Sequence, residues 1–96
     1  MRVRYTPRAR SDFEAIFSYL DQRSPSGALA VKRTIERRIR QLADAPFMAP
    51  ITDATGIYEL TILRYPYKVY YYIESDEVRI LHIRHTSRQR PDVTGL

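Results

Sequence analysis

The sequence predicts an α+β fold in which a helical hairpin packs on one face of a small antiparallel sheet. Three observations predict it. Apolar residues recur at helical spacing over about residues 7–45, the period changes to that of strands over about 57–85, and a short strand pattern precedes the helices. Two helices that precede a run of strands are typical of helices layered on one sheet face, so the expected order of elements is β-α-α-β-β-β.

The chain length and composition favour one soluble domain. Ninety-six residues suit a single domain with a small core, which we expect to span residues 1–96. Within it we expect a helical hairpin at about 7–45, a loop at 46–56, a β-meander at about 57–85 and a C-terminal tail at 86–96. No apolar run is long enough to cross a membrane, and the amino-terminal segment lacks the apolar centre of a signal peptide, so we expect a cytoplasmic protein. With no cysteine and two histidines, neither a metal nor another cofactor is expected.

Each predicted helix has a start signal. "RVRY" at residues 2–5 alternates as a short strand, and Thr6 and Pro7 follow it as a capping residue and a first helical residue. Ser24 and Pro25 repeat this signal for the second helix, and Pro46 follows its end. The apolar faces comprise Ala9, Phe13, Ile16, Phe17 and Leu20 in the first helix, and Ala28, Val31, Ile35, Ile39 and Leu42 in the second.

Basic side chains lie mostly off the apolar stripe of the second helix. They are Lys32, Arg33, Arg37, Arg38 and Arg40. Two interpretations stay open for them: a surface for a phosphate backbone, or an ordinary solvated helix face.

Three segments rich in β-branched and aromatic residues predict the meander. They read "IYELTILRY", "YKVYYYIE" and "EVRILHIRH", and Ser75 with Asp76 between the last two predicts a tight turn.

The tyrosine-rich middle strand presents two different surfaces, because side chains alternate between the faces of a sheet. We expect the odd set to pack against the helices: Tyr65, Tyr67, Val69, Tyr71 and Ile73. The even set then lies on the open face of the sheet: Pro66, Lys68, Tyr70, Tyr72 and Glu74. Strict alternation in the next strand places Ile80, His82 and Arg84 on one face, and Leu81, Ile83 and His85 on the other.

A basic surface near one edge of the sheet is the candidate site. Its predicted members are Arg64, Lys68, Arg84, His85 and Arg88. The chain has 16 basic and 11 acidic residues, a net charge of +5 and an isoelectric point of about 9.8, which suits contact with nucleic acid or with an acidic protein.

The element order, the spacing of the second helix and the ending "YKVYYYI…DEVRILHIRHTSR" resemble the RelE/ParE family of toxins from bacterial type II toxin–antitoxin systems. The resemblance implies a cognate antitoxin as partner and a hetero-oligomer with it. It also implies one of two activities. RelE-like members cleave messenger RNA on the ribosome, whereas ParE-like members poison DNA gyrase without a catalytic residue of their own.

The residues at the positions of the RelE-like catalytic groups favour the ParE-like activity. The lysines of the first meander strand fall at Glu59 and Thr61, the arginine of the middle strand falls on Lys68, and no tyrosine follows His85. A lysine keeps the charge of an arginine but loses its two-pronged grip on phosphate. We therefore expect a gyrase inhibitor with no catalytic residue. The alternative is a ribosome-dependent endoribonuclease that acts on mRNA through Lys68, Arg84, His85 and Arg88.

Overall fold

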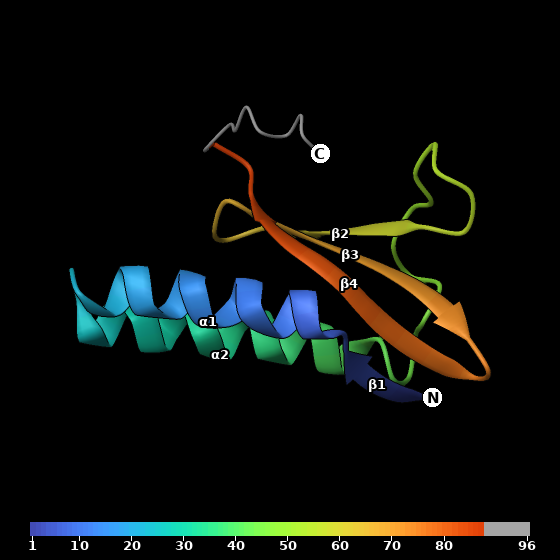
Figure 1. Ribbon diagram of the computed structural model, residues 1–96, viewed down its shortest axis with the longest axis horizontal. Helices are drawn as coiled ribbons and strands as arrows, with labels where there is room; N and C mark the ends of the chain where they lie inside the picture. Colours follow the sequence, from blue (N-terminus) through green and yellow to red (C-terminus); the bar gives the residue numbers. More distant parts are fainter. Residues whose placement is uncertain (88–96) are drawn as a thin grey trace.

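The order of helices and strands is the one that the sequence predicts. The computed structural model describes residues 1–87. Its elements are β1 (Arg2–Tyr5), α1 (Pro7–Asp21), α2 (Pro25–Gln41), β2 (Tyr58–Ile62), β3 (Tyr67–Glu74) and β4 (Glu77–His85) (Figure 1).

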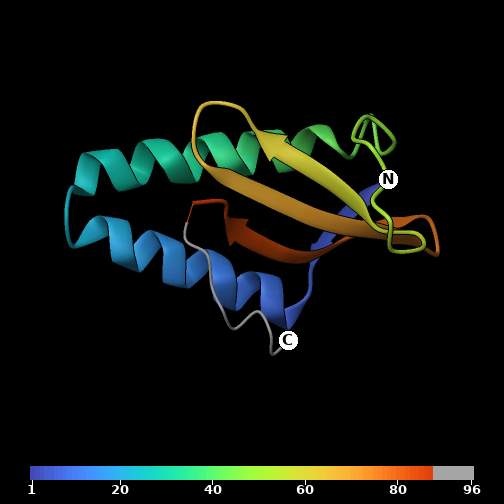
Figure 2. The ribbon, with the colours of Figure 1, turned by 90° about the horizontal axis from the view of Figure 1, so that it is seen from above.

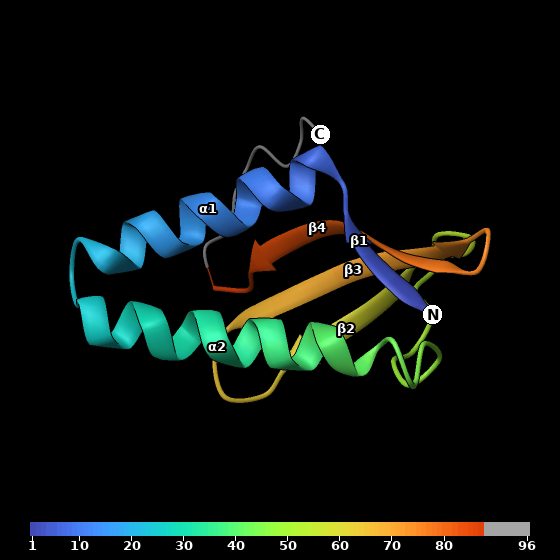
Figure 3. The ribbon, with the colours of Figure 1, turned by 90° about the horizontal axis from the view of Figure 1, so that it is seen from below.

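The four strands form one mixed sheet in the order β1-β4-β3-β2. Strands β2, β3 and β4 form the predicted antiparallel meander. Strand β1 adds to it parallel to β4, so that the first and last strands of residues 1–87 are neighbours (Figure 3). Two parallel neighbouring strands need a long crossover connection between them. The chain from β1 to β4 provides it, and the helical hairpin is the first part of that connection.

The two helices cover one face of the sheet and leave the other face open (Figures 1 and 2). Both begin at the predicted caps. The side chain of Thr6 accepts a hydrogen bond from the Ala9 N–H at 3.2 Å, and that of Ser24 accepts one from the Gly27 N–H at 3.1 Å. Among the described residues, no helix is both long enough and apolar enough to cross a membrane.

The core lies between the helices and the odd-numbered residues of β3. Tyr67, Val69 and Tyr71 are all buried, with Tyr71 at 0% exposure, which confirms the predicted facing of this strand. The Tyr71 hydroxyl donates to the Pro46 carbonyl at 2.8 Å, and its ring stacks on that of Tyr58 at 5.1 Å. A buried hydroxyl needs such a partner.

Strand β4 contains a β-bulge that strict alternation does not predict. Tyr70 pairs with His82 while Tyr71 pairs with Ile80, so Leu81 is an extra residue in β4. Beyond such a residue the side chains change face. Ile80 is therefore buried, whereas His82 and Arg84 lie opposite Tyr70 and Lys68 on the open face.

The predicted facing of this strand is accordingly wrong in two places. Ile80 does not share a face with His82 and Arg84, and Leu81 does not share one with Ile83 and His85. The bulge is the physical reason, because it shifts the alternation by one residue.

The outer edge of β4 is covered by two different elements. Strand β1 pairs with residues 77–80. Further along, the Ile83 N–H donates to Asp12 Oδ2 of α1 at 3.1 Å, and the Thr6 N–H donates to the Ile80 carbonyl at 3.0 Å. The edge of β4 is therefore covered by β1 along its first residues and by α1 further on. Both elements provide hydrogen-bond partners for backbone groups that an open edge would leave unpaired.

Candidate functional site

Four side chains from three strands form a connected polar network on the open face, which we call the open-face network: Glu59, Lys68, Tyr70 and Arg84. Lys68 Nζ lies 3.1 Å from Glu59 Oε2, and the Tyr70 hydroxyl donates to the same oxygen at 2.9 Å. Arg84 Nη2 donates to the Tyr70 hydroxyl at 3.3 Å. Lys68 and Arg84 are direct cross-strand partners, as are Glu59 and Tyr70, so the strand register itself assembles this network.

Glu59 is the anion at the centre of this network. Burial alone would raise the pKa of its carboxyl group, but the hydrogen bonds from Lys68 and Tyr70 and the positive charges of Lys68 and Arg84 lower it below the ordinary glutamate value. The ionised carboxylate thus places a negative charge directly beside Lys68 Nζ.

The structure brings together only part of the predicted site. Arg64 lies in the turn between β2 and β3, with its guanidinium 5.8 Å from the centre of the Tyr65 ring. A hollow of about 440 Å³ has both Arg64 and Lys68 in its lining. Of the predicted site residues, Lys68 and Arg84 are direct neighbours, and Arg64 lies at the same end of the sheet.

His85 lies on the opposite face of the sheet. It pairs with the buried Tyr67, and the two rings meet edge to face at 5.0 Å. Its Nδ1 accepts a hydrogen bond from the Ser87 N–H at 3.1 Å. Arg88, the last predicted member, lies outside the described residues.

His82, which is not among the predicted site residues, lies beside the open-face network. His82 Nδ1 is 2.7 Å from Asp12 Oδ2, and its ring stacks on Tyr70 at 5.9 Å with an angle of 16° between the planes. Arg8 Nε lies 3.8 Å from the same carboxylate oxygen. A shallow groove of about 800 Å³ is lined by His82, Tyr70 and Arg8 together with Glu59 and Arg84.

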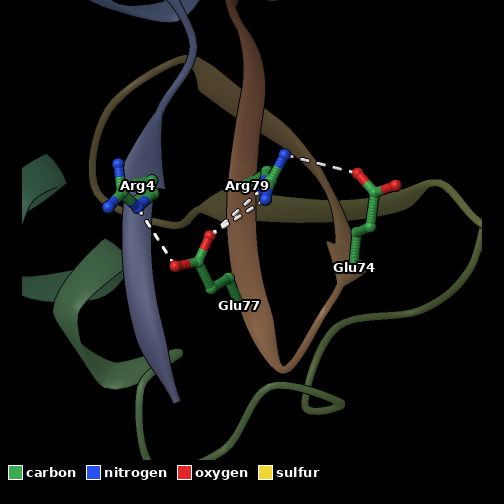
Figure 4. Close-up of polar contacts among 4 residues, drawn as sticks. All are labelled: Arg4, Glu74, Glu77 and Arg79. Atoms are coloured by element: carbon green, nitrogen blue, oxygen red, sulfur yellow. Dashed lines mark hydrogen bonds and ion pairs between the residues drawn. The ribbon is translucent and has the colours of Figure 1, made fainter.

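A second charged cluster occupies the other end of the open face (Figure 4). The carboxylate of Glu77 bridges Arg4 of β1 and Arg79 of β4, each at 3.1 Å, and Arg79 also pairs with Glu74 at 3.3 Å. Burial alone would raise the pKa of Glu77, but the two arginines outweigh it and lower that pKa. Within residues 1–87, no three His, Cys, Asp or Glu side chains come together as metal ligands.

This fold, a helical hairpin on one face of a four-stranded mixed sheet, matches solved structures of a ParDE and a RelBE toxin–antitoxin system. The chain belongs to the ParE toxin family, since the model described as "ParE toxin of type II toxin-antitoxin system, parDE" matches residues 3–90. The protein is thus a type II toxin of the ParE/RelE family.

Proteins that are similar to this chain carry both ParE and RelE names. The chain is 33% identical over 87 residues to Toxin RelE2 of Caulobacter vibrioides, which covers 91% of this chain and 97% of the relative. Its fold matches the chromosomal ParDE system of P. aeruginosa with a TM-score of 0.78 and 25% identity, over 88% of this chain and 95% of the other. It also matches the intact E. coli RelBE complex with a TM-score of 0.68 and 11% identity, over 93% and 98% of the two chains.

Proposed function

We propose that this toxin acts in the cytoplasm as a ParE-like inhibitor of DNA gyrase and that a cognate antitoxin neutralises it. The open-face network carries the proposal. RNA cleavage needs a base for the 2′-hydroxyl, cations for the crowded phosphate and an acid for the leaving 5′-oxygen. Here Lys68 is paired with Glu59, Thr61 lies opposite Lys68, and His85 faces away from both.

The surface around the helical hairpin supports an antitoxin partner. A cavity of about 320 Å³ between α1 and α2 is lined by the aromatic side chains of Tyr5, Phe13 and Phe17 together with charged residues. Such a cavity suits the apolar side chains of an amphipathic segment, and the net charge of +5 suits an acidic one. A disordered antitoxin segment that folds on binding fits both properties. We expect the two proteins to copurify from a strain that carries both genes.

Ribosome-dependent endoribonuclease activity is the second candidate, and His82 is the observation that favours it. Asp12 holds its Nδ1, so that Nε2 is the nitrogen available to take a proton. Arg84 and Arg8 line the same groove and could contact a phosphate. His82 would take the proton of the 2′-hydroxyl, the 2′-oxygen would attack phosphorus, and the P–O5′ bond would break as the 5′-oxygen takes a proton from water. The products would be a 2′,3′-cyclic phosphate and a 5′-hydroxyl, and His82 would return its proton to the solvent.

A side-by-side assay of supercoiling and translation tests the proposal. Wild-type protein should block supercoiling of a plasmid by gyrase and ATP, and should leave transcripts intact in a translating extract. Lys68→Ala and Arg84→Ala should each weaken gyrase inhibition several-fold at low salt, and this loss should shrink at higher salt, because screening weakens the long-range steering that the two charges provide in the wild type.

Two further variants separate the candidates. If the protein is an endoribonuclease, His82→Ala should lower RNA cleavage, since loss of a general base typically costs 10²–10⁴-fold. The double change Glu59→Lys with Thr61→Lys should then raise RNA cleavage. Neither variant should change RNA cleavage if the protein is only a gyrase inhibitor. Transcript cleavage by the wild type that disappears in His82→Ala, with normal supercoiling throughout, would overturn the gyrase proposal and establish the second candidate.

A further inference from the structure

The outer face of α2 carries three exposed arginines in line. Arg33, Arg37 and Arg40 are exposed, whereas the apolar stripe that includes Ile35 and Ile39 is buried against the sheet. At about 100° per residue the three arginines fall within roughly 60° of one another, on the side of the helix opposite Ile35. They span about 10 Å along the helix axis. We call them the arginine row.

None of these charges is neutralised within the described part of the chain. No hydrogen bond or ion pair there joins Arg33, Arg37 or Arg40 to a carboxylate. Glu36, the one acidic residue of α2, lines the cavity between the helices with Lys32 and so lies to one side of the row. The row is therefore a concentrated positive surface on a rigid element.

The composition of α2 indicates what such a surface can bind. Apart from the row, the exposed residues of α2 include Ser26, Ala30, Gln41 and Leu29, and Leu29, at 39% exposure, is the one large apolar side chain among these four. A peptide partner that docks as an amphipathic helix needs an apolar groove, which this face lacks. A single-stranded nucleic acid needs aromatic side chains for base stacking, and α2 contains none. Guanidinium groups on a convex helix suit the phosphates of a duplex.

We propose that the arginine row is a sequence-independent binding surface for the phosphate backbone of duplex DNA. It lies on the helical side of the molecule, so it is separate from the open-face network. The toxin would thereby bind the phosphates of duplex DNA without contacting the bases. This inference does not depend on the target of the toxin, since it concerns direct binding of the chain to DNA.

The salt dependence of binding to a short labelled duplex tests this inference. In fluorescence anisotropy with a 20-base-pair duplex of arbitrary sequence, three phosphate contacts predict a slope of log K against log salt of about −2.7. The affinity of the wild type should thus fall about 40-fold between 50 and 200 mM NaCl.

A charge-matched pair of variants locates the surface. The triple variant Arg33→Gln, Arg37→Gln, Arg40→Gln should lose at least about tenfold in affinity at 50 mM NaCl and most of the salt slope, while the helix persists because glutamine is a good helix former. The control Arg2→Gln, Arg10→Gln, Arg23→Gln removes the same charge from other exposed positions and should keep most of the affinity. Circular dichroism and thermal melts establish that both variants fold.

Three outcomes would overturn the proposal. Equal losses in the two triple variants would show that net charge alone accounts for binding. Tighter binding of single-stranded RNA than of duplex DNA would assign the chain to another nucleic acid. Binding of poly-glutamate through the row, with no binding of duplex DNA, would assign the row to an acidic protein. Because the assay contains no gyrase, each outcome is independent of the proposed inhibition of gyrase.

Discussion

At the scale of single residues, Tyr70 and Tyr71 are neighbours in sequence with opposite surroundings. Tyr71 is fully buried and its ring stacks on Tyr58, whereas Tyr70 is half-buried on the open face. We expect Tyr71→Ala to lower the free energy of unfolding by about 3–5 kcal/mol, because it removes a large core side chain. Tyr70→Ala should cost about 1 kcal/mol. Denaturant melts measure both values, and a loss for Tyr70→Ala as large as that for Tyr71→Ala would contradict the facing of β3.

Glu59 should make stability depend on pH. Its pKa is lowered in the folded protein, so its contribution is complete above the ordinary glutamate pKa of about 4.3 and is lost as the pH falls through the lower folded value. Glu59→Gln should therefore show a flatter fall in unfolding free energy between about pH 5 and pH 2 than the wild type does. Melts across this range measure it, with Glu14→Gln on α1 as a control of equal charge. The same steepness in wild type and Glu59→Gln would mean that the network adds no stability.

At the scale of elements, one carboxylate attaches α1 to the edge of β4. Asp12 Oδ2 accepts from both the Ile83 N–H and the His82 ring. We expect Asp12→Ala to lower the free energy of unfolding by about 1–3 kcal/mol, because a half-buried backbone N–H loses its acceptor. The more specific readout is hydrogen exchange at the Ile83 amide, which should become faster than in the wild type. Glu14→Gln, in the same helix, should leave that exchange rate unchanged, and unchanged exchange in Asp12→Ala would show that Asp12 does not hold this edge.

The starts of both helices could be predicted from sequence, whereas the bulge could not. A cap is a local interaction: Thr6 reaches Ala9 and Ser24 reaches Gly27, each three residues away. The bulge at Leu81 depends instead on how β4 pairs with Tyr70 and Tyr71. No glycine or proline marks it in the sequence of β4, so the alternation of side chains gave the wrong face for Ile80.

At the scale of the whole molecule, some contacts of the candidate site could be predicted from the sequence and others could not. Lys68 and Arg84 could be predicted as neighbours, because each meander strand pairs with the next and their alternation is regular at that end. The contact of His82 with Asp12 joins residues 70 positions apart on different elements. No local pattern encodes such a contact. It follows from the packing of α1 against the edge of β4, which the sequence alone does not specify.

The parallel pairing of β1 with β4 also bears on how the toxin is made. The partner of Val3 is Val78, so the first strand has no neighbour in the sheet until nearly the whole chain exists. At synthesis rates of about 5–20 residues per second, roughly 4–15 s separate the two strands as they leave the ribosome. The open face, which takes side chains from β3 and β4, is likewise completed last. The complete four-stranded sheet therefore cannot form until β4, the last strand of the described residues, has left the ribosome.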